Sequence, residues 1–116
     1  MMIQAERRTR RWRRHPLDVP IRVIVHRARK TSVFTGRGNE LSEGGMALTA
    51  GVELKPGDEA EVEFTPPYSG SPIRIRGMVR NRAGYRYGIE FLAGSDREAE
   101  QVDHLRMMLS VLSSAL

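Results

Sequence analysis

The sequence contains no cysteine, which excludes disulfides, thiolate nucleophiles and cysteine-based zinc sites. Its three histidines, His15, His26 and His104, are far apart in the chain and do not indicate a metal cluster. Ser42 lacks the sequence pattern of an activated nucleophile. We therefore expect a binding module rather than an enzyme, with no cofactor and no metal.

Long apolar runs are also missing. No segment approaches the roughly 20 apolar residues of a membrane span. The first seven residues lack the apolar run of a signal peptide. We therefore expect a cytoplasmic protein without membrane insertion. The length of 116 residues fits one compact domain.

Positive charge, in contrast, is abundant and unevenly placed. Lysine and arginine number 19 against 14 aspartates and glutamates. Six arginines fall within the first fourteen residues: Arg7, Arg8, Arg10, Arg11, Arg13 and Arg14. Such a local positive field favours an anionic partner, for example phosphate, nucleic acid or acidic lipid.

Apolar alternation predicts short strands in the middle of the chain. The alternating runs lie at 19–26, 32–37, 46–49, 59–64, 73–80 and 85–91. Turns join them without intervening helices, a pattern typical of a small antiparallel barrel or sandwich. We divide the single domain into a flexible basic arm (1–15), a β-barrel (16–93) and a C-terminal helix (94–116).

The C-terminal segment has helical signals. Ser95 and Glu98 form a capping box, in which serine accepts from first-turn amides and glutamate reaches back. An apolar stripe follows at helical spacing: Ala99, Val102, Leu105, Leu109 and Leu112. We expect this helix to cover an open end or side of the barrel. Met107, Met108 and Val111 widen the apolar surface, so a homodimer through the helix is a second hypothesis.

The segment from Glu40 to Met46 separates two of the apolar runs. Its sequence, Glu-Leu-Ser-Glu-Gly-Gly-Met, predicts a loop with exposed backbone amides, a hydroxyl and two carboxylates. Gly44 and Gly45 have no Cβ, so the main chain can approach a ligand closely. With the arginines upstream, this loop is a candidate cradle for a polar anion.

These two segments, in this order and before this strand pattern, resemble the PilZ domain family. The family signature is Arg-x-x-x-Arg followed, after roughly 25 residues, by Asp/Asn-x-Ser-x-x-Gly. Arg10 and Arg14 match the arginines, and Ser42 and Gly45 match the second motif. The resemblance extends from about Glu6 to Leu92 and implies a six-stranded antiparallel β-barrel.

The resemblance also implies a ligand, cyclic di-GMP, and a role as a bacterial second-messenger receptor. In the family, the signature arginines bind the phosphates and the guanine Hoogsteen edge, while the Asp/Asn and serine hold the other guanine edge. Glu40 stands where the family has Asp or Asn. Its carboxylate is still an acceptor but is displaced by about one methylene, so we expect weakened or re-aimed recognition. Asn39 substitutes for it if the loop shifts by one residue.

Further ligand contacts are expected within the arm and the loop. Arg11 is a candidate for binding a second, stacked dinucleotide, and Gly44 is a candidate for close backbone approach. Trp12 has two interpretations: stacking on a guanine or packing back on the barrel wall. The arm is expected to close over the ligand, and the resulting change is relayed to an unidentified protein partner.

A second arginine stripe comprises Arg74, Arg76, Arg80, Arg82 and Arg86. Cross-strand ion pairs with Glu59, Glu61 and Glu63 are its favoured explanation, and a second binding surface is the alternative.

Two other functions remain open. A small-barrel nucleic-acid binder would use the arm on phosphates, but the strands offer few exposed aromatics for base stacking. A degenerate PilZ adaptor without nucleotide is the other alternative, and Glu40 is the argument for it.

Overall fold

The structure, a computed structural model, describes residues 14–66 and 70–115, with side chains as far as Leu109. These residues form six strands and a helix: β1 (His15–Arg27), β2 (Lys30–Leu41), β3 (Gly45–Ala50), β4 (Glu59–Phe64), β5 (Ile73–Ala83), β6 (Arg86–Phe91) and α2 (Asp96–Ala115). Arg10, Arg11 and Trp12, with the rest of the predicted arm to residue 13, lie outside the described residues.

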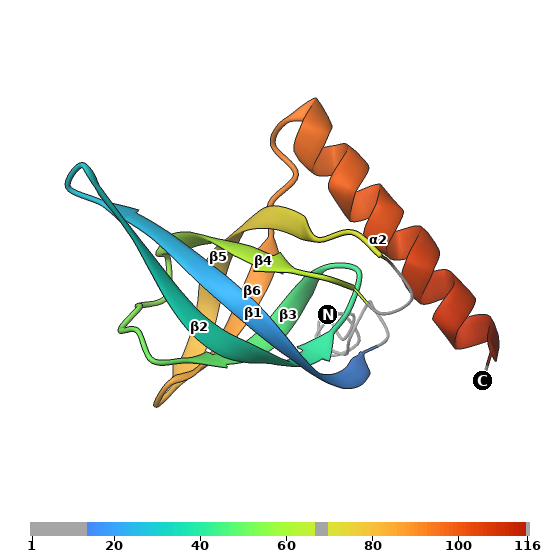
Figure 1. The fold of residues 1–116 in the computed structure, drawn as a ribbon, viewed down its shortest axis with the longest axis horizontal. Coiled ribbons are helices and arrows are strands. Elements are labelled where there is room, and N and C mark those ends of the chain that lie inside the picture. The colour runs from blue at the N-terminus through green and yellow to red at the C-terminus, as the bar shows by residue number, and fades with distance from the viewer. Residues whose placement is uncertain (1–13, 67–69, 116) are drawn as a thin grey trace, which may run out of the picture.

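The strands close into an antiparallel barrel in the order β1-β2-β3-β6-β5-β4 (Figure 1). The closing contact is short, because β1 pairs with β4 only from Arg22 to Ile24. The β1–β2 hairpin is longer than its neighbours and projects from the barrel (Figure 1). The predicted six-stranded antiparallel barrel with a C-terminal helix is thus confirmed.

The core follows from the two-residue period of the strands. In β4, Ala60, Val62 and Phe64 are buried, whereas the intervening glutamates lie on the outer face. Tyr87 is fully buried, and its hydroxyl donates to the carbonyl of Val52 at 2.5 Å and accepts from the amide of Leu54 at 3.1 Å. These bonds satisfy the polar end of a large core side chain and attach the β3–β4 connection to β6.

Several predicted strand boundaries were wrong. β1 begins at His15 rather than Val19, because His15 and Pro16 pair with Leu41 and Glu40. Glu40 and Leu41 therefore belong to β2, and the predicted loop shrinks to residues 42–44. β5 continues to Ala83 instead of ending at residue 80, and Tyr85 belongs to the turn before β6 and is 55% exposed. Long-range pairing, which local alternation does not reveal, decided the first two boundaries.

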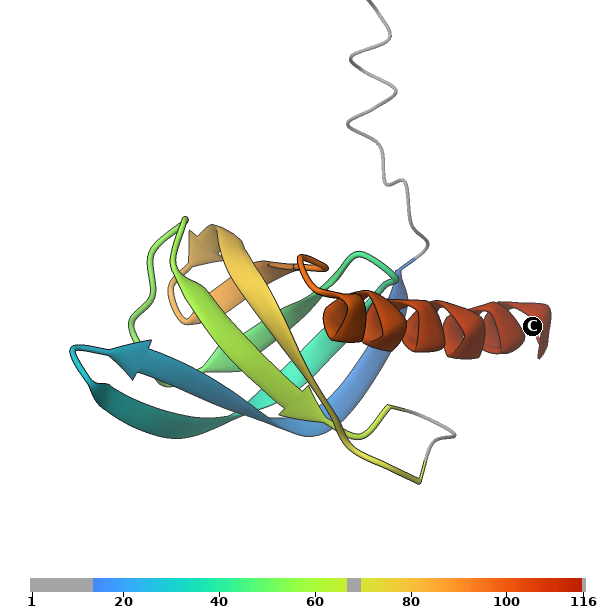
Figure 2. The same ribbon diagram turned by 90° about the horizontal axis from the view of Figure 1, so that it is seen from above.

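Helix α2 begins as its capping box predicts. Ser95 Oγ accepts from the amide of Glu98 at 3.1 Å, and Glu98 Oε1 accepts from the amides of Gly94 and Ser95. Leu105 and Leu109 are buried and extend the barrel core. The helix lies along one end of the barrel and continues past it (Figure 2). Met107 is 68% exposed.

The described residues contain no helix long and apolar enough to cross a membrane.

Candidate functional site

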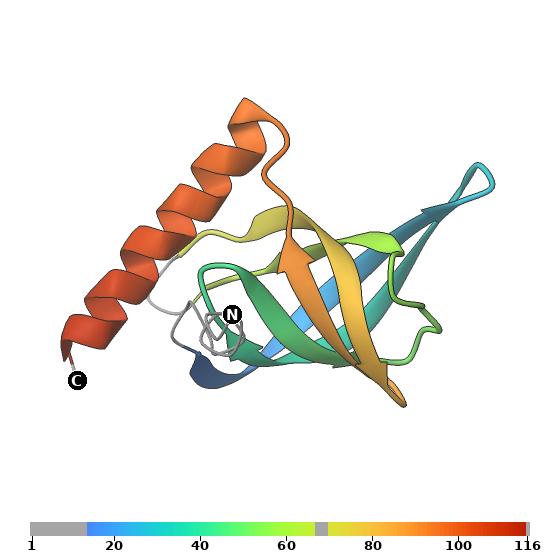
Figure 3. The ribbon, with the colours of Figure 1, turned by 180° about the vertical axis from the view of Figure 1, so that it is seen from behind.

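A groove of about 480 Å³ opens on the outer wall of the barrel, where β3, β6 and β5 lie side by side (Figure 3). Strand register explains why it is hollow. Glu40, Ala47, Gly88 and Asn81 lie opposite one another in a row across β2, β3, β6 and β5. The two central members of this row are alanine and glycine, so they leave space above the sheet. At about 4.8 Å between strands, the row spans roughly 14 Å.

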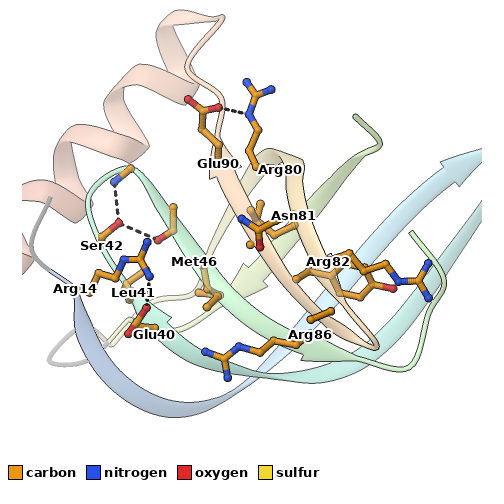
Figure 4. A pocket seen from close by; sticks show the side chains of 17 residues that line it. Arg14, Glu40, Leu41, Ser42, Met46, Arg80, Asn81, Arg82, Arg86 and Glu90 are labelled. Carbon is orange, nitrogen blue, oxygen red and sulfur yellow. Dashed lines mark hydrogen bonds and ion pairs between the residues drawn. The ribbon is translucent and has the colours of Figure 1, made fainter. Parts of the chain in front are cut away.

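Arg14 and Glu40 form one wall of the groove (Figure 4). Arg14 Nη1 donates to Glu40 Oε1 at 3.0 Å. The side chains are 48% and 27% exposed, so water weakens the attraction, and such a pair contributes only about 0–1 kcal/mol. An anionic ligand can therefore replace Glu40 as the partner of Arg14 at little cost.

Ser42 organises the short loop between β2 and β3. Its amide donates to the carbonyl of Gly45 at 2.9 Å, and its hydroxyl accepts from the amide of Gly44 at 3.3 Å. The carbonyl of Gly44 in turn accepts from the amide of Phe91 at 2.9 Å. The serine thus holds a tight turn at the edge of the groove.

Gly45 lines the groove, and its lack of a side chain has a structural reason. A Cβ at this position would lie far inside van der Waals contact with the carbonyl oxygen of Ile89 on β6. The close pairing of β3 with β6 therefore requires glycine here. Gly44 lines the groove as well.

Asn39 lies next to the groove but does not line it. It occupies a register shift between Gly38 and Glu40, and its Oδ1 accepts from the hydroxyl of Thr49 at 2.9 Å. In this structure the hydrogen-bond acceptor at the groove is the carboxylate of Glu40, not the amide oxygen of Asn39.

The opposite wall comes from the β5–β6 hairpin, with Arg80, Asn81, Arg82 and Arg86. Sequence reasoning did not assign these residues to the ligand site. Alternation along β6, which puts Arg86, Gly88 and Glu90 on one outer face, is a signal that could have indicated Arg86. That signal becomes useful only once β6 is known to pair with β3.

The predicted arginine stripe divides into two parts. Arg74 pairs with Glu61 and Glu63, and Arg76 pairs with Glu59 at 3.0 Å, as the ion-pair interpretation predicted. For the remaining three arginines that interpretation was wrong. The pairing of β4 with β5 ends at Met78, so Arg80 and Arg82 lie beyond the glutamates, and Arg86 is on β6. Arg80 pairs with Glu90 on β6 instead.

Two groups where α2 meets β5, away from the groove, have shifted pKa values. Arg76 Nε and Nη2 donate to the two oxygens of Glu98 at 2.8 and 3.2 Å. These bonds lower the pKa of Glu98 and raise that of Arg76. Among the described residues, no three or more histidine, aspartate or glutamate side chains gather into a metal site.

A protein-family model for the PilZ domain matches residues 6–107. The chain belongs to the PilZ domain family. PilZ domains are ligand-binding receptors and adaptors. A comparison with functionally curated proteins finds no match.

Solved PilZ structures share the fold. The PilZ domain of CeSA from a cellulose-synthesizing bacterium is 18% identical, with a TM-score of 0.65, over 84% of this chain and 98% of that one. The PilZ domain of YcgR from Escherichia coli, with c-di-GMP, is 20% identical, with a TM-score of 0.62, over 93% and 95%. The K. pneumonia MrkH–c-di-GMP complex is 16% identical, with a TM-score of 0.62, over 93% of this chain and 55% of that one.

In this PilZ domain, four residues at signature positions meet at the groove: Arg14, Glu40, Ser42 and Gly45. They come from the residue just before β1, the end of β2, the connecting loop and the start of β3. Arg10, Arg11 and Trp12 precede the described residues, and the chain reaches β1 directly beside Glu40, which pairs with Pro16.

Proposed function

We propose that this PilZ domain is a receptor for cyclic di-GMP, which binds in the groove between Glu40 and the β5–β6 hairpin. The observation that carries the proposal is the convergence of Arg14, Glu40 and Ser42 on one groove. Its volume of about 480 Å³ is typical of small-molecule sites, which measure about 300–1,000 Å³. The YcgR and MrkH structures, which contain c-di-GMP, support the choice of ligand.

The ligand needs two kinds of partner, and the groove offers both. Phosphate oxygens and the guanine Hoogsteen edge accept paired hydrogen bonds from an arginine fork, which suits Arg14. The guanine Watson–Crick edge donates from N1 and N2 and suits the carboxylate of Glu40. Binding then exchanges the Arg14–Glu40 ion pair for two contacts with the ligand.

The N-terminal arm completes the site in this proposal. Arg10 and Arg11 supply further guanidinium groups, and Trp12 supplies a surface for base stacking. Closure of the arm over the nucleotide is the change that a protein partner in the cytoplasm reads. The ordering cost is about 1–2 kcal/mol per residue, which the charge-assisted bonds must exceed.

An adaptor that no longer binds nucleotide is the second candidate. The observation in its favour is that Glu40, at the Asp/Asn position, engages Arg14 within the protein. In that case the ion pair occupies the ligand position permanently.

Isothermal titration with cyclic di-GMP at physiological salt separates the two. The receptor proposal predicts saturable binding by the wild-type protein, no binding of GTP, and a loss of roughly ten- to hundredfold in Arg14→Ala. Because Arg14 contributes little to stability, the variant should keep the wild-type melting temperature. If the wild-type protein shows no binding at about 0.3 mM cyclic di-GMP, its binding free energy is weaker than roughly 5 kcal/mol. The receptor proposal is then wrong and the adaptor function remains.

A further inference from the structure

The groove has four lining arginines, and three of them already have partners. Arg14 pairs with Glu40, and Arg80 pairs with Glu90. Arg82 donates to the carbonyls of Gly84 at 2.7 Å and Leu54 at 3.1 Å, and its guanidinium lies 5.7 Å from the ring centre of Tyr87. Arg82 is therefore committed to holding the hairpin turn.

Arg86 differs from these three. It is exposed and lines the groove, and its side chain has no hydrogen bond or ion pair with any residue that the structure describes. Alternation along β6 places its side chain on the same outer face as Gly88, two residues away, where the groove floor lies. Figure 4 shows it extending from β6 along the groove beneath Met46. Arg82 Nη2 also lies 3.7 Å from Glu53 Oε2, so Arg86 is the lining arginine that has no acidic partner among the described residues.

Asn81 stands at the far end of the row that begins with Glu40. A Cβ on Gly88 would approach Asn81 Oδ1 to 2.6 Å and Nδ2 to 2.8 Å, so the amide lies directly over the glycine. Within the described part of the chain, this amide makes no hydrogen bond. It faces the groove with one donor group and one acceptor group available.

We propose that Arg86 and Asn81 form a second half of the ligand site, with Arg86 binding a phosphate and Asn81 binding a guanine edge. The inference rests on the proposed function and extends it to the β5–β6 hairpin, outside the signature motifs. Arg86 provides charge without breaking an internal ion pair, so it makes contact before Arg14 has released Glu40. The row from Glu40 to Asn81 is roughly 14 Å across, so its two ends can contact different parts of one ligand.

The test is titration of cyclic di-GMP into the wild-type protein, Arg86→Ala, Arg86→Lys and Asn81→Ala at two salt concentrations. Arg97→Ala is the matched control, because Arg97 is an exposed arginine on α2, away from the groove. Arg86→Ala should weaken binding roughly ten- to hundredfold and reduce its salt dependence. Arg86→Lys should fall between the wild type and Arg86→Ala, because lysine keeps the charge without the planar fork.

Asn81→Ala should weaken binding by roughly three- to tenfold, as expected for a neutral hydrogen bond, with unchanged salt dependence. Unchanged melting temperatures would show that the variants fold, which we expect because both side chains are exposed. If the wild type binds and Arg86→Ala binds equally well, the inference is wrong while the receptor function stands. If the wild type does not bind, both fail.

Discussion

Two regions of this PilZ domain use the same residue types for different purposes. In the groove, Arg14 and Glu40 share a single 3.0 Å contact. Beneath the helix, Arg76 makes a bidentate pair of hydrogen bonds with Glu98 and a third hydrogen bond with Glu59. Glu98 also accepts from two backbone amides at the start of α2. The Arg14–Glu40 pair can thus be exchanged for contacts with a ligand, whereas the Arg76–Glu98 pair helps to hold α2 against the barrel.

The number of additional bonds explains this difference. Each additional hydrogen-bond donor stabilises the ionised carboxylate. When one donor is removed, the remaining donors still bind the carboxylate. Glu98 has such a set and Glu40 does not. Glu43, which follows Ser42, connects the loop beside the groove to α2, because its Oε1 lies 3.4 Å from Arg106 Nε.

The largest effect that we predict is at the start of β3, beside the groove. Gly45→Ala should lower the free energy of unfolding by about 3 kcal/mol, at the upper end of overpacking costs, because the new methyl group meets the carbonyl of Ile89. Urea denaturation measures this loss. Gly51→Ala is the control, since its Cβ meets nothing within 4 Å. Equal stability of the two variants would mean that the β3–β6 pairing tolerates a side chain.

An intermediate effect should appear at low pH. Arg76 lowers the pKa of Glu98 below its ordinary value of 4.5, so the folded state binds this proton less readily than the unfolded state. The stabilisation is therefore complete above pH 4.5 and disappears as the pH falls below it. In thermal melts between pH of about 6 and about 3, Glu98→Gln should lose less of its stability than the wild type. Glu100→Gln, an exposed neighbour on α2, should follow the wild-type curve; if Glu98→Gln follows it too, the pair beneath the helix is as dispensable as the one in the groove.

The smallest effect concerns the exchangeable pair. Glu40→Asn removes the internal partner of Arg14 and installs a residue that the family motif accepts. We expect an affinity for cyclic di-GMP roughly two- to fivefold higher, the value of one exposed ion pair. Titration calorimetry measures it, with Glu100→Asn as a control for the loss of one negative charge. Weaker binding would show that the carboxylate of Glu40 is needed by the ligand itself.

Predictions from the sequence succeeded where the signal was local. The capping box at Ser95 and Glu98 was confirmed because its bonds join residues three positions apart. The alternation in β4 indicated the buried face correctly, and the family motif indicated that Arg14, Glu40 and Ser42 belong together. The roles of these residues in binding, and those of Arg10, Arg11 and Trp12, stay predictions.

Prediction failed where partners are distant in the chain. The sequence suggested that all five arginines of the stripe pair with the glutamates of the neighbouring strand. The bulge in β5 and the pairing of β6 with β3 instead place Arg80, Asn81 and Arg86 on the groove. A one-residue bulge moves the side chains that follow it to the opposite face of the strand, and the local sequence pattern does not predict the bulge.

By itself, then, the sequence determined the class of fold, the capped helix and one wall of the groove, because periodicity, capping and the family motif are carried by residues near one another in the chain. The tertiary structure decided the other wall, the alanine–glycine floor and the division of the arginines into structural and available ones. Strand register across the closed barrel sets all three, and register depends on the fit of the whole core rather than on any single segment.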